Sequence, residues 1–217
     1  MIWDDWKFRW QKALTACERI GGEIRPLKIK PKATDADVLS VESKLGFQLP
    51  KDFRQVLTEF SSSIEFNWYL PDIKLPNGFR EIGSGECFWD LERLIEFEVG
   101  RKSWIEACLE DFDEEYNLDV WHNKLVFDYV CNGDQIALDL NKLPETSVVY
   151  LSHEGDEFHG YILGNSFTDF MERWSLLGCV GSEGWQMLQF ISSPTSGLEP
   201  HTEKARRWRE WFGLDFS

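Results

Sequence analysis

Residues 130–170 bring together two histidines and several acidic residues, the residue types that bind metal ions or transfer protons. A zinc-protease motif of the H-E-x-x-H type has its two histidines four residues apart on one face of a helix. Here His153-Glu154 is followed by the next histidine only at His159, six positions after the first, in a segment with the pattern of a hairpin. We therefore expect no metal site in this region.

Asp134, Asp139, His153 and Glu154 are the candidate catalytic set for a hydrolase, because carboxylates and imidazoles act as general acids and bases. The chain has 38 Asp and Glu residues, so two carboxylates in one segment are weak evidence for a catalytic pair. Asp134 fits a turn, and Asp139 fits the outward side of a strand. We keep a hydrolase as the third alternative, and we expect no catalytic residue and no cofactor.

The DFDEEYNLD segment that starts at Asp111 is rich in the carboxylates that bind calcium. An EF-hand loop needs Gly at its sixth position and Glu at its twelfth, where this sequence has Tyr116 and His122. No Ser or Cys lies in a known nucleophile motif, and no phosphate-binding glycine loop follows a predicted strand. The motifs therefore assign neither a calcium site nor a catalytic centre.

The formal net charge of -15 is concentrated in the middle of the chain. Residues 81–119 contain thirteen acidic and three basic residues, whereas residues 1–32 contain eight basic and four acidic ones. Such a field repels nucleic acids and anionic lipids and favours a basic protein partner, although a merely solvated acidic surface is the alternative. We expect a basic protein partner, no nucleic-acid partner and no membrane partner; the expected partner-binding residues are Glu110, Asp111, Asp113, Glu114, Glu115 and Asp119.

Length and cysteine content indicate the class of protein. The 217 residues suit a single domain with one sizeable core, and the sequence specifies no oligomeric state. The five cysteines are widely spaced without a C-x-x-C pair, which predicts free thiols in a reducing compartment. No signal sequence and no run of about 18 apolar residues is present, so we expect a cytoplasmic protein.

The order of the predicted elements indicates the fold class. Capping-box patterns begin helices at Thr34 and Ser166, and Asn132-Gly133 predicts a hairpin with a type I′ turn. Helices come first, antiparallel strands follow and helices end the chain, which predicts an α+β fold. The expected helices span residues 3–20, 34–45, 50–60, 88–97, 104–112, 166–177, 185–190 and 205–212; the expected strands span residues 64–70, 125–131, 136–140, 148–151 and 159–163.

Two blocks of the sequence resemble the SUKH superfamily, in the branch named for the yeast Smi/Knr cell-wall synthesis regulator. The first block is ATDADVLSVESKLGFQLPKDFRQVLTEF at residues 33–60. The second block is the segment with the two histidines at residues 130–170. The resemblance covers about residues 33–177, leaving an N-terminal helix at residues 1–22 and a C-terminal extension at residues 178–217. The matching residues are Glu42, Leu45, Gly46, Leu49, Pro50, Phe53, Leu57, Trp121, Asn132, Gly133, Asp134, Asp139, His153, Glu154, Ser166 and Phe167.

This resemblance implies a central, mostly antiparallel sheet flanked by helices, to which the terminal helices are added. Bacterial members look like immunity proteins that neutralise polymorphic toxins, often nucleases, by direct binding. The yeast-type members are regulators of signalling and of the cell wall. We therefore expect a non-enzymatic binding protein of the immunity type, with a regulatory scaffold as the second alternative; the resemblance supplies no catalytic residue.

Overall fold

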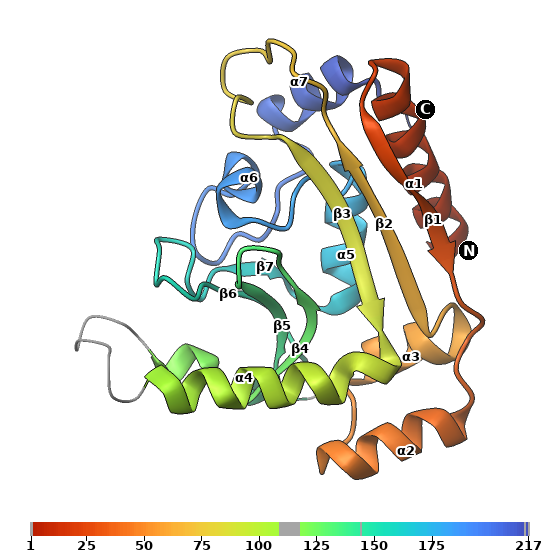
Figure 1. Ribbon diagram of the computed structural model, residues 1–217, viewed down its shortest axis with the longest axis vertical. Coiled ribbons are helices and arrows are strands. Elements are labelled where there is room, and N and C mark those ends of the chain that lie inside the picture. Colours follow the sequence, from red (N-terminus) through yellow and green to blue (C-terminus); the bar gives the residue numbers. More distant parts are fainter. Residues whose placement is uncertain (1, 109–117, 144, 215, 217) are drawn as a thin grey trace.

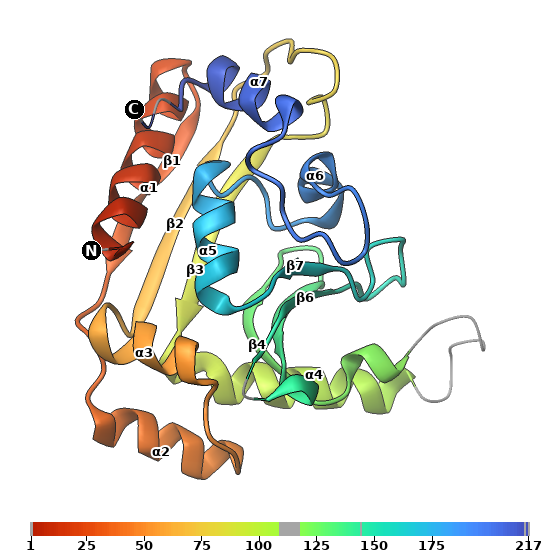
Figure 2. The same cartoon turned by 180° about the vertical axis from the view of Figure 1, so that it is seen from behind.

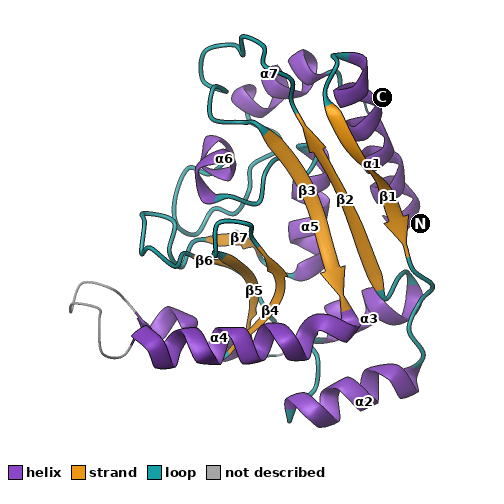
Figure 3. Cartoon of the chain, in the orientation of Figure 1, coloured by secondary structure: helices purple, strands orange, loops and turns teal. Residues whose placement is uncertain are grey.

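The computed structural model describes residues 2–108, 118–143, 145–214 and 216, and it shows an α+β fold, as predicted (Figure 1). The strands divide between two antiparallel sheets, which stand apart in Figure 3. The first sheet has the order β1-β2-β3 and the second the order β4-β5-β6-β7. Their strands are β1 (Glu23–Ile29), β2 (Ser63–Tyr69), β3 (Ser84–Asp90), β4 (Lys124–Tyr129), β5 (Gln135–Asp139), β6 (Val148–Leu151) and β7 (Ile162–Gly164).

Helices cover both sheets. Figure 2 shows α1 and α5 on one face of the first sheet, while the long helix α4 lies against β4 of the second sheet. The α-helices are α1 (Ile2–Arg19), α2 (Asp35–Leu45), α3 (Lys51–Glu59), α4 (Leu94–Cys108), α5 (Phe167–Leu176), α6 (Gly184–Met187) and α7 (Glu203–Phe212). Four single turns of 3-10 helix, at Leu91–Arg93, Leu118–Trp121, Leu140–Lys142 and Leu188–Phe190, connect these elements in the described parts of the chain.

The segment around Phe88 differs most from the sequence-based prediction. We expected one helix over residues 88–97 and another over residues 104–112, because aromatic residues recur there at helical spacing. Instead, Phe88 lies in β3, which pairs in continuous register with β2, and the helix α4 follows. Residues 104–108 of the second predicted helix belong to α4, and residues 109–112 lie outside the described residues. The pairing of β3 with an adjacent strand outweighs its local helical pattern. The predictions also missed β1, whose inner residues are only half-buried at Ile24 and Leu27.

The predicted helix caps are confirmed, but the predicted turn type is wrong. Thr34 and Asp37 form a reciprocal capping box, and the Ser166 hydroxyl accepts from the backbone N–H of Asp169. The connection between β4 and β5 spans residues 130–134, in which Gly133 has a φ of +103° and Asn132 has no positive φ. The Asn132 side chain instead accepts from the Asp134 N–H at 3.0 Å, which fixes a longer turn.

One continuous core joins the terminal helices to both sheets. Trp6 and Trp10 of α1 are fully buried, and Trp10 lies 6.0 Å from Trp89 of β3 between ring centroids. At the other end of the chain, Trp208 of α7 is fully buried 6.4 Å from Trp68 of β2. Both extensions outside the resemblance therefore contribute large side chains to the common core.

The four cysteines whose side chains the structure describes form no disulfide. Cys17, Cys87 and Cys179 are free and buried, while Cys131 is free and exposed. In the part of the chain that the structure covers, no helix has both the length and the apolar character needed to cross a membrane.

Candidate functional site

The acidic segment that sequence analysis singled out lies mostly outside the described residues. This holds for Glu110, Asp111, Asp113, Glu114 and Glu115. Asp119 is described and exposed, at the start of the single turn before β4.

Some acidic side chains from the middle of the chain are buried and do not contribute to the surface. Asp90 and Glu98 are 8% and 6% exposed, and Glu86 is only partly exposed. Glu98 forms a bidentate ion pair with the buried Arg101 of α4.

Five exposed acidic residues of the described chain lie on α4, on the turn before β4 and on the loop after β6. Glu154, Asp156 and Glu157 are exposed on the loop between β6 and β7, and Glu106 is exposed on the last turns of α4. The loop and the helix end are neighbours, because the rings of Trp104 and His153 lie 6.0 Å apart. We call Glu106, Asp119, Glu154, Asp156 and Glu157 the acidic face.

The Asp134 carboxylate ties together the turn between β4 and β5 and the start of the loop after β6. Its Oδ2 accepts from the Tyr150 hydroxyl at 2.5 Å and from Asn132 Nδ2 at 2.7 Å. Its Oδ1 accepts from the His153 N–H at 2.8 Å and lies 2.7 Å from His153 Nδ1. The Tyr150 hydroxyl in turn accepts from the N–H of Gly184 at 2.8 Å.

The hydrogen bonds of this network favour the ionised form of the Asp134 carboxylate. Burial raises the pKa of Asp134, but the hydrogen bonds from Tyr150, His153 and Asn132 outweigh that effect and leave its pKa below the usual value. Burial, followed by the nearby Asp134 charge, raises the pKa of Tyr150. Such a network stabilises a fold, because every buried oxygen has its partner.

The structure brings together three residues of the candidate hydrolase set but not the fourth. His153 lies between Asp134 and Glu154, with Nδ1 2.7 Å from Asp134 Oδ1 and Nε2 3.8 Å from Glu154 Oε1, whereas Asp139 lies apart from them. Asp134 precedes β5 and Asp139 ends it, so the two carboxylates stand at opposite ends of one strand, about 16 Å apart at 3.3 Å per residue. Asp139 is occupied by an ion pair with the buried Lys124 at 3.0 Å and by the N–H of Asn141. Glu154 is exposed. The four residues therefore do not converge on one cleft.

The remaining matched residues also support the fold. Glu42 is 6% exposed; its carboxylate accepts from the Leu49 N–H at 2.9 Å and pairs with Arg54, which fixes the corner between α2 and α3. Gly46 caps α2 with a φ of +84°, and Pro50 is the N-cap residue of α3. Together these residues fix the position of α3 relative to α2.

Trp121 and Phe167 hold the second sheet to its neighbours. The Trp121 carbonyl accepts from Arg101 of α4 at 2.5 Å, and its ring is buried. Phe167 is buried at the start of α5, where its N–H donates to the Asp52 carboxylate of α3 at 2.7 Å. Asp52 caps a helix more than a hundred residues away in the sequence, so no local sequence pattern predicts this contact.

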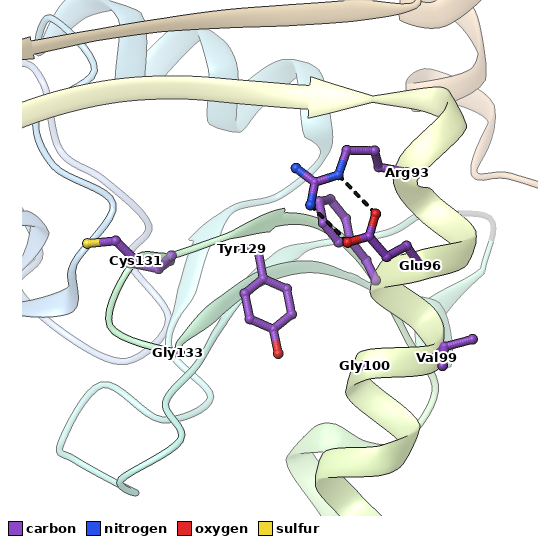
Figure 4. A pocket seen from close by; sticks show the side chains of 9 residues that line it. Arg93, Glu96, Val99, Gly100, Tyr129, Cys131 and Gly133 are labelled. Carbon is purple, nitrogen blue, oxygen red and sulfur yellow. Dashed lines mark hydrogen bonds and ion pairs between the residues drawn. The ribbon is translucent and has the colours of Figure 1, made fainter.

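A cleft that the sequence did not reveal lies where β3 meets β4, beside the start of α4 (Figure 4). Its central hollow has a volume of about 350 Å³. Towards α4 it continues into a wider hollow of about 600 Å³, and towards the loop before α6 into a smaller one. Residues that line it include Arg25, Asn67, Tyr69, Glu86, Phe88, Arg93, Phe97, Asp128, Tyr129, Cys131 and Glu183.

Two carboxyl groups of this cleft have surroundings that favour their protonated forms. Asp128 is 2% exposed, and its Oδ2 has no hydrogen-bond partner. Burial raises the pKa of Asp128 well above its usual value, and the nearby charge of Glu86 adds to this. Burial likewise raises the pKa of Glu86 to about 7, an effect that Glu183 reinforces.

These shifts predict a pH dependence of stability. Between pH values of about 4.5 and about 7, folded Glu86 keeps a proton that the unfolded chain has released. The free energy of unfolding should therefore fall as pH rises through this window, by up to about 1.4 kcal/mol per pH unit from this group. Asp128 acts in the same direction, since its pKa is also raised.

Urea unfolding of the wild type, Glu86→Gln and the exposed-site control Glu81→Gln at about pH 5, 6 and 7 measures this effect. We expect the wild-type stability, relative to that of Glu86→Gln, to decline with rising pH. The control should follow the wild type. Parallel pH profiles for the wild type and Glu86→Gln would show that Glu86 titrates normally.

No three His, Cys, Asp or Glu side chains within the described residues are grouped closely enough to hold a metal ion. The cleft therefore offers carboxylates, aromatic rings and two arginines, but not a ligand set for a metal. Its chemistry suits an organic cation.

Comparison with known families gives one match. The model described as the SMI1 / KNR4 family (SUKH-1) matches residues 32–173, about two thirds of the chain. The search of curated proteins found no match. The matched span includes every matching residue named above, from Glu42 to Phe167, as well as the central cleft carboxyls Glu86 and Asp128.

Proposed function

From the premise that this chain belongs to the SMI1/KNR4 family (SUKH-1), we propose that it is a non-enzymatic binding protein whose acidic face docks a basic protein partner. The observation that carries this proposal is the acidic face itself. Its members come from α4, from the turn before β4 and from the loop between β6 and β7. The segment between α4 and β4 carries five further acidic residues in the sequence.

The charge distribution supports a basic partner. No Lys or Arg occurs in the sequence between Lys142 and Arg173, so the loop after β6 contributes only negative charge. Complementary potentials speed the encounter of two proteins and select against partners of like charge. The family resemblance then makes the finer proposal an immunity role, in which the partner is a polymorphic toxin such as a nuclease.

Reversing the charge of the acidic face should weaken binding. For the triple variant Glu106→Lys, Glu154→Lys and Glu157→Lys, we expect the Kd for a cognate basic toxin domain to rise by about tenfold or more at low salt. The dependence of the Kd on ionic strength should also become shallower. Binding titrations at several salt concentrations, with candidate toxins from the same locus, measure both effects.

The matched control places three charge reversals on exposed sites away from the acidic face, with Glu18→Lys, Glu23→Lys and Asp72→Lys. These residues lie near the end of α1, at the start of β1 and in the loop after β2, near α7 in Figure 1. If both triple variants lose affinity equally, the effect comes from net charge and the proposed face is wrong. Growth rescue during co-expression with the toxin separates the immunity role from the regulatory alternative.

A further inference from the structure

The carboxyl groups of Glu86, Asp128 and Glu183 line the cleft between β3 and β4, and within the described residues none of them forms an ion pair within 4.0 Å. Two arginines also line the cleft, and their charges favour the ionised forms of Glu86 and Asp128. Arg93 is already paired with Glu96 at 3.0 Å, as Figure 4 shows, whereas Arg25 forms no ion pair with the described residues. The three carboxyl groups therefore outnumber the one arginine of the cleft that is not held in an ion pair.

Asp128 makes this imbalance costly. It lies in β4, where a bulge interrupts the register with β5 between Val126 and Asp128, and its side chain lines the cleft. A buried carboxyl oxygen without a partner destabilises the protein unless a proton or a cation compensates it. Glu86 is close enough for its charge to act on Asp128, and its carboxylate accepts from Asn67 Nδ2 at 2.8 Å and from the Ser182 hydroxyl.

The walls of the cleft favour a flat cation. Tyr69 and Tyr129 are 42% and 43% exposed, and both line the cleft. On the α4 side, the guanidinium of Arg93 already lies 4.6 Å from the centroid of the Phe97 ring and 5.5 Å from that of Phe88. Arginine combines with aromatic faces and carboxylates in this way, and both tyrosine and arginine are enriched at the centres of interfaces.

We propose that this cleft binds an arginine side chain of the protein partner, with its guanidinium against the carboxyl groups of Glu86 and Glu183 and beside the exposed tyrosines. Asp128, whose raised pKa favours the neutral acid, lines the same cleft without contacting the ligand. The inference rests on the proposed function, because it names the chemistry by which a basic partner is recognised. It places that contact in a built cleft, distinct from the acidic face.

Protonation of Glu86 gives the proposal a specific signature. A guanidinium binds the ionised carboxylate, so binding and protonation compete. Since burial raises the pKa of Glu86 to about 7, the arginine must displace a proton near neutral pH. We expect affinity to rise with pH, by about thirtyfold between pH values of about 5.5 and 8. An ordinary surface carboxylate is ionised throughout this range and would show no such rise.

The test uses the full chain without its partner and a blocked arginine, N-acetyl-arginine N-methylamide, as the probe. Backbone amide NMR titrations should show saturable shifts at Tyr69, Glu86 and Glu183, and none with the neutral isostere N-acetyl-citrulline N-methylamide. Glu86→Gln should abolish these shifts, whereas Glu81→Gln, an exposed site outside the cleft, should leave them unchanged. A blocked lysine that binds as tightly would overturn the assignment to arginine.

If Glu86→Gln fails to fold, the pH dependence of the affinity of the wild type for the probe still tests the proposal. Shifts spread over the surface acids, or an affinity independent of pH, would overturn the cleft proposal. If the probe fails to bind while a basic partner still binds through the acidic face, only the cleft proposal is wrong. If the probe binds as expected but no basic partner does, the cleft site stands and the proposed function fails.

Discussion

Replacing Asp134 with alanine is expected to lower the free energy of unfolding by about 3–5 kcal/mol, because it leaves buried donors without an acceptor. The Tyr150 hydroxyl and the His153 N–H both donate to this carboxylate. Asp134 is 1% exposed, so water does not replace the lost acceptor without rearrangement. Urea unfolding monitored by tryptophan fluorescence measures the loss.

Two further variants keep this prediction testable if Asp134→Ala does not fold. Tyr150→Phe removes one of the four donors and the acceptor of the Gly184 N–H, and we expect it to cost about 1–3 kcal/mol. Asp72→Ala, at an exposed site, should change stability by less than about 0.5 kcal/mol. A loss below about 1 kcal/mol for Asp134→Ala would mean that the network does not hold the turn.

The parts of the structure that depend on residues close together in the sequence were predictable. Helix caps and turns depend on residues a few positions apart, so the Thr34–Asp37 and Ser166–Asp169 patterns predicted helix starts correctly. The same locality made Asn132-Gly133 a reliable hairpin signal. It did not predict the turn type, because the Asn132 side chain binds Asp134 instead.

Features that depend on distant pairing were not predictable in this way. The helical spacing of the aromatic residues around Phe88 is real, but β2 provides a partner strand that no local pattern shows. The cleft likewise draws Glu86, Asp128 and Glu183 from three separate elements. One signal was available: Asp128 is a charged residue in the otherwise apolar run LVFDYV, and such residues in buried strands need a partner or a function.

Under the proposed function, the acidic face would act on a partner at long range and the cleft at short range. Exposed charges on a loop and a helix end steer a basic partner but contribute little fixed geometry, since they are screened by salt. A cleft with buried carboxyl groups and aromatic walls holds one side chain in one place. Mutations of the face should therefore act mainly on the association rate, and mutations of the cleft mainly on dissociation.

Trp208→Ala is expected to cost about 3–5 kcal/mol, because it removes a fully buried indole at the centre of an aromatic cluster. The Trp208 ring lies 5.0 Å from that of Phe212 and 5.6 Å from that of Phe79, and its N–H donates to the Leu177 carbonyl at 2.9 Å. Trp208 also lies against Trp68 of β2, which places the C-terminal extension in direct contact with the first sheet.

The matched control is Trp185→Ala on α6, where the indole is 42% exposed, and we expect a loss of less than about 1 kcal/mol. The number of unfolding transitions distinguishes two roles for the C-terminal extension. If α7 belongs to the same cooperative unit as the sheets, Trp208→Ala shifts a single transition, seen equally by fluorescence and circular dichroism. If the extension folds separately, the variant instead produces an early transition that leaves the unfolding of the sheets unchanged. Since Trp68 also donates to the Gly178 carbonyl at 2.8 Å, across the boundary of the resemblance, we expect the single transition.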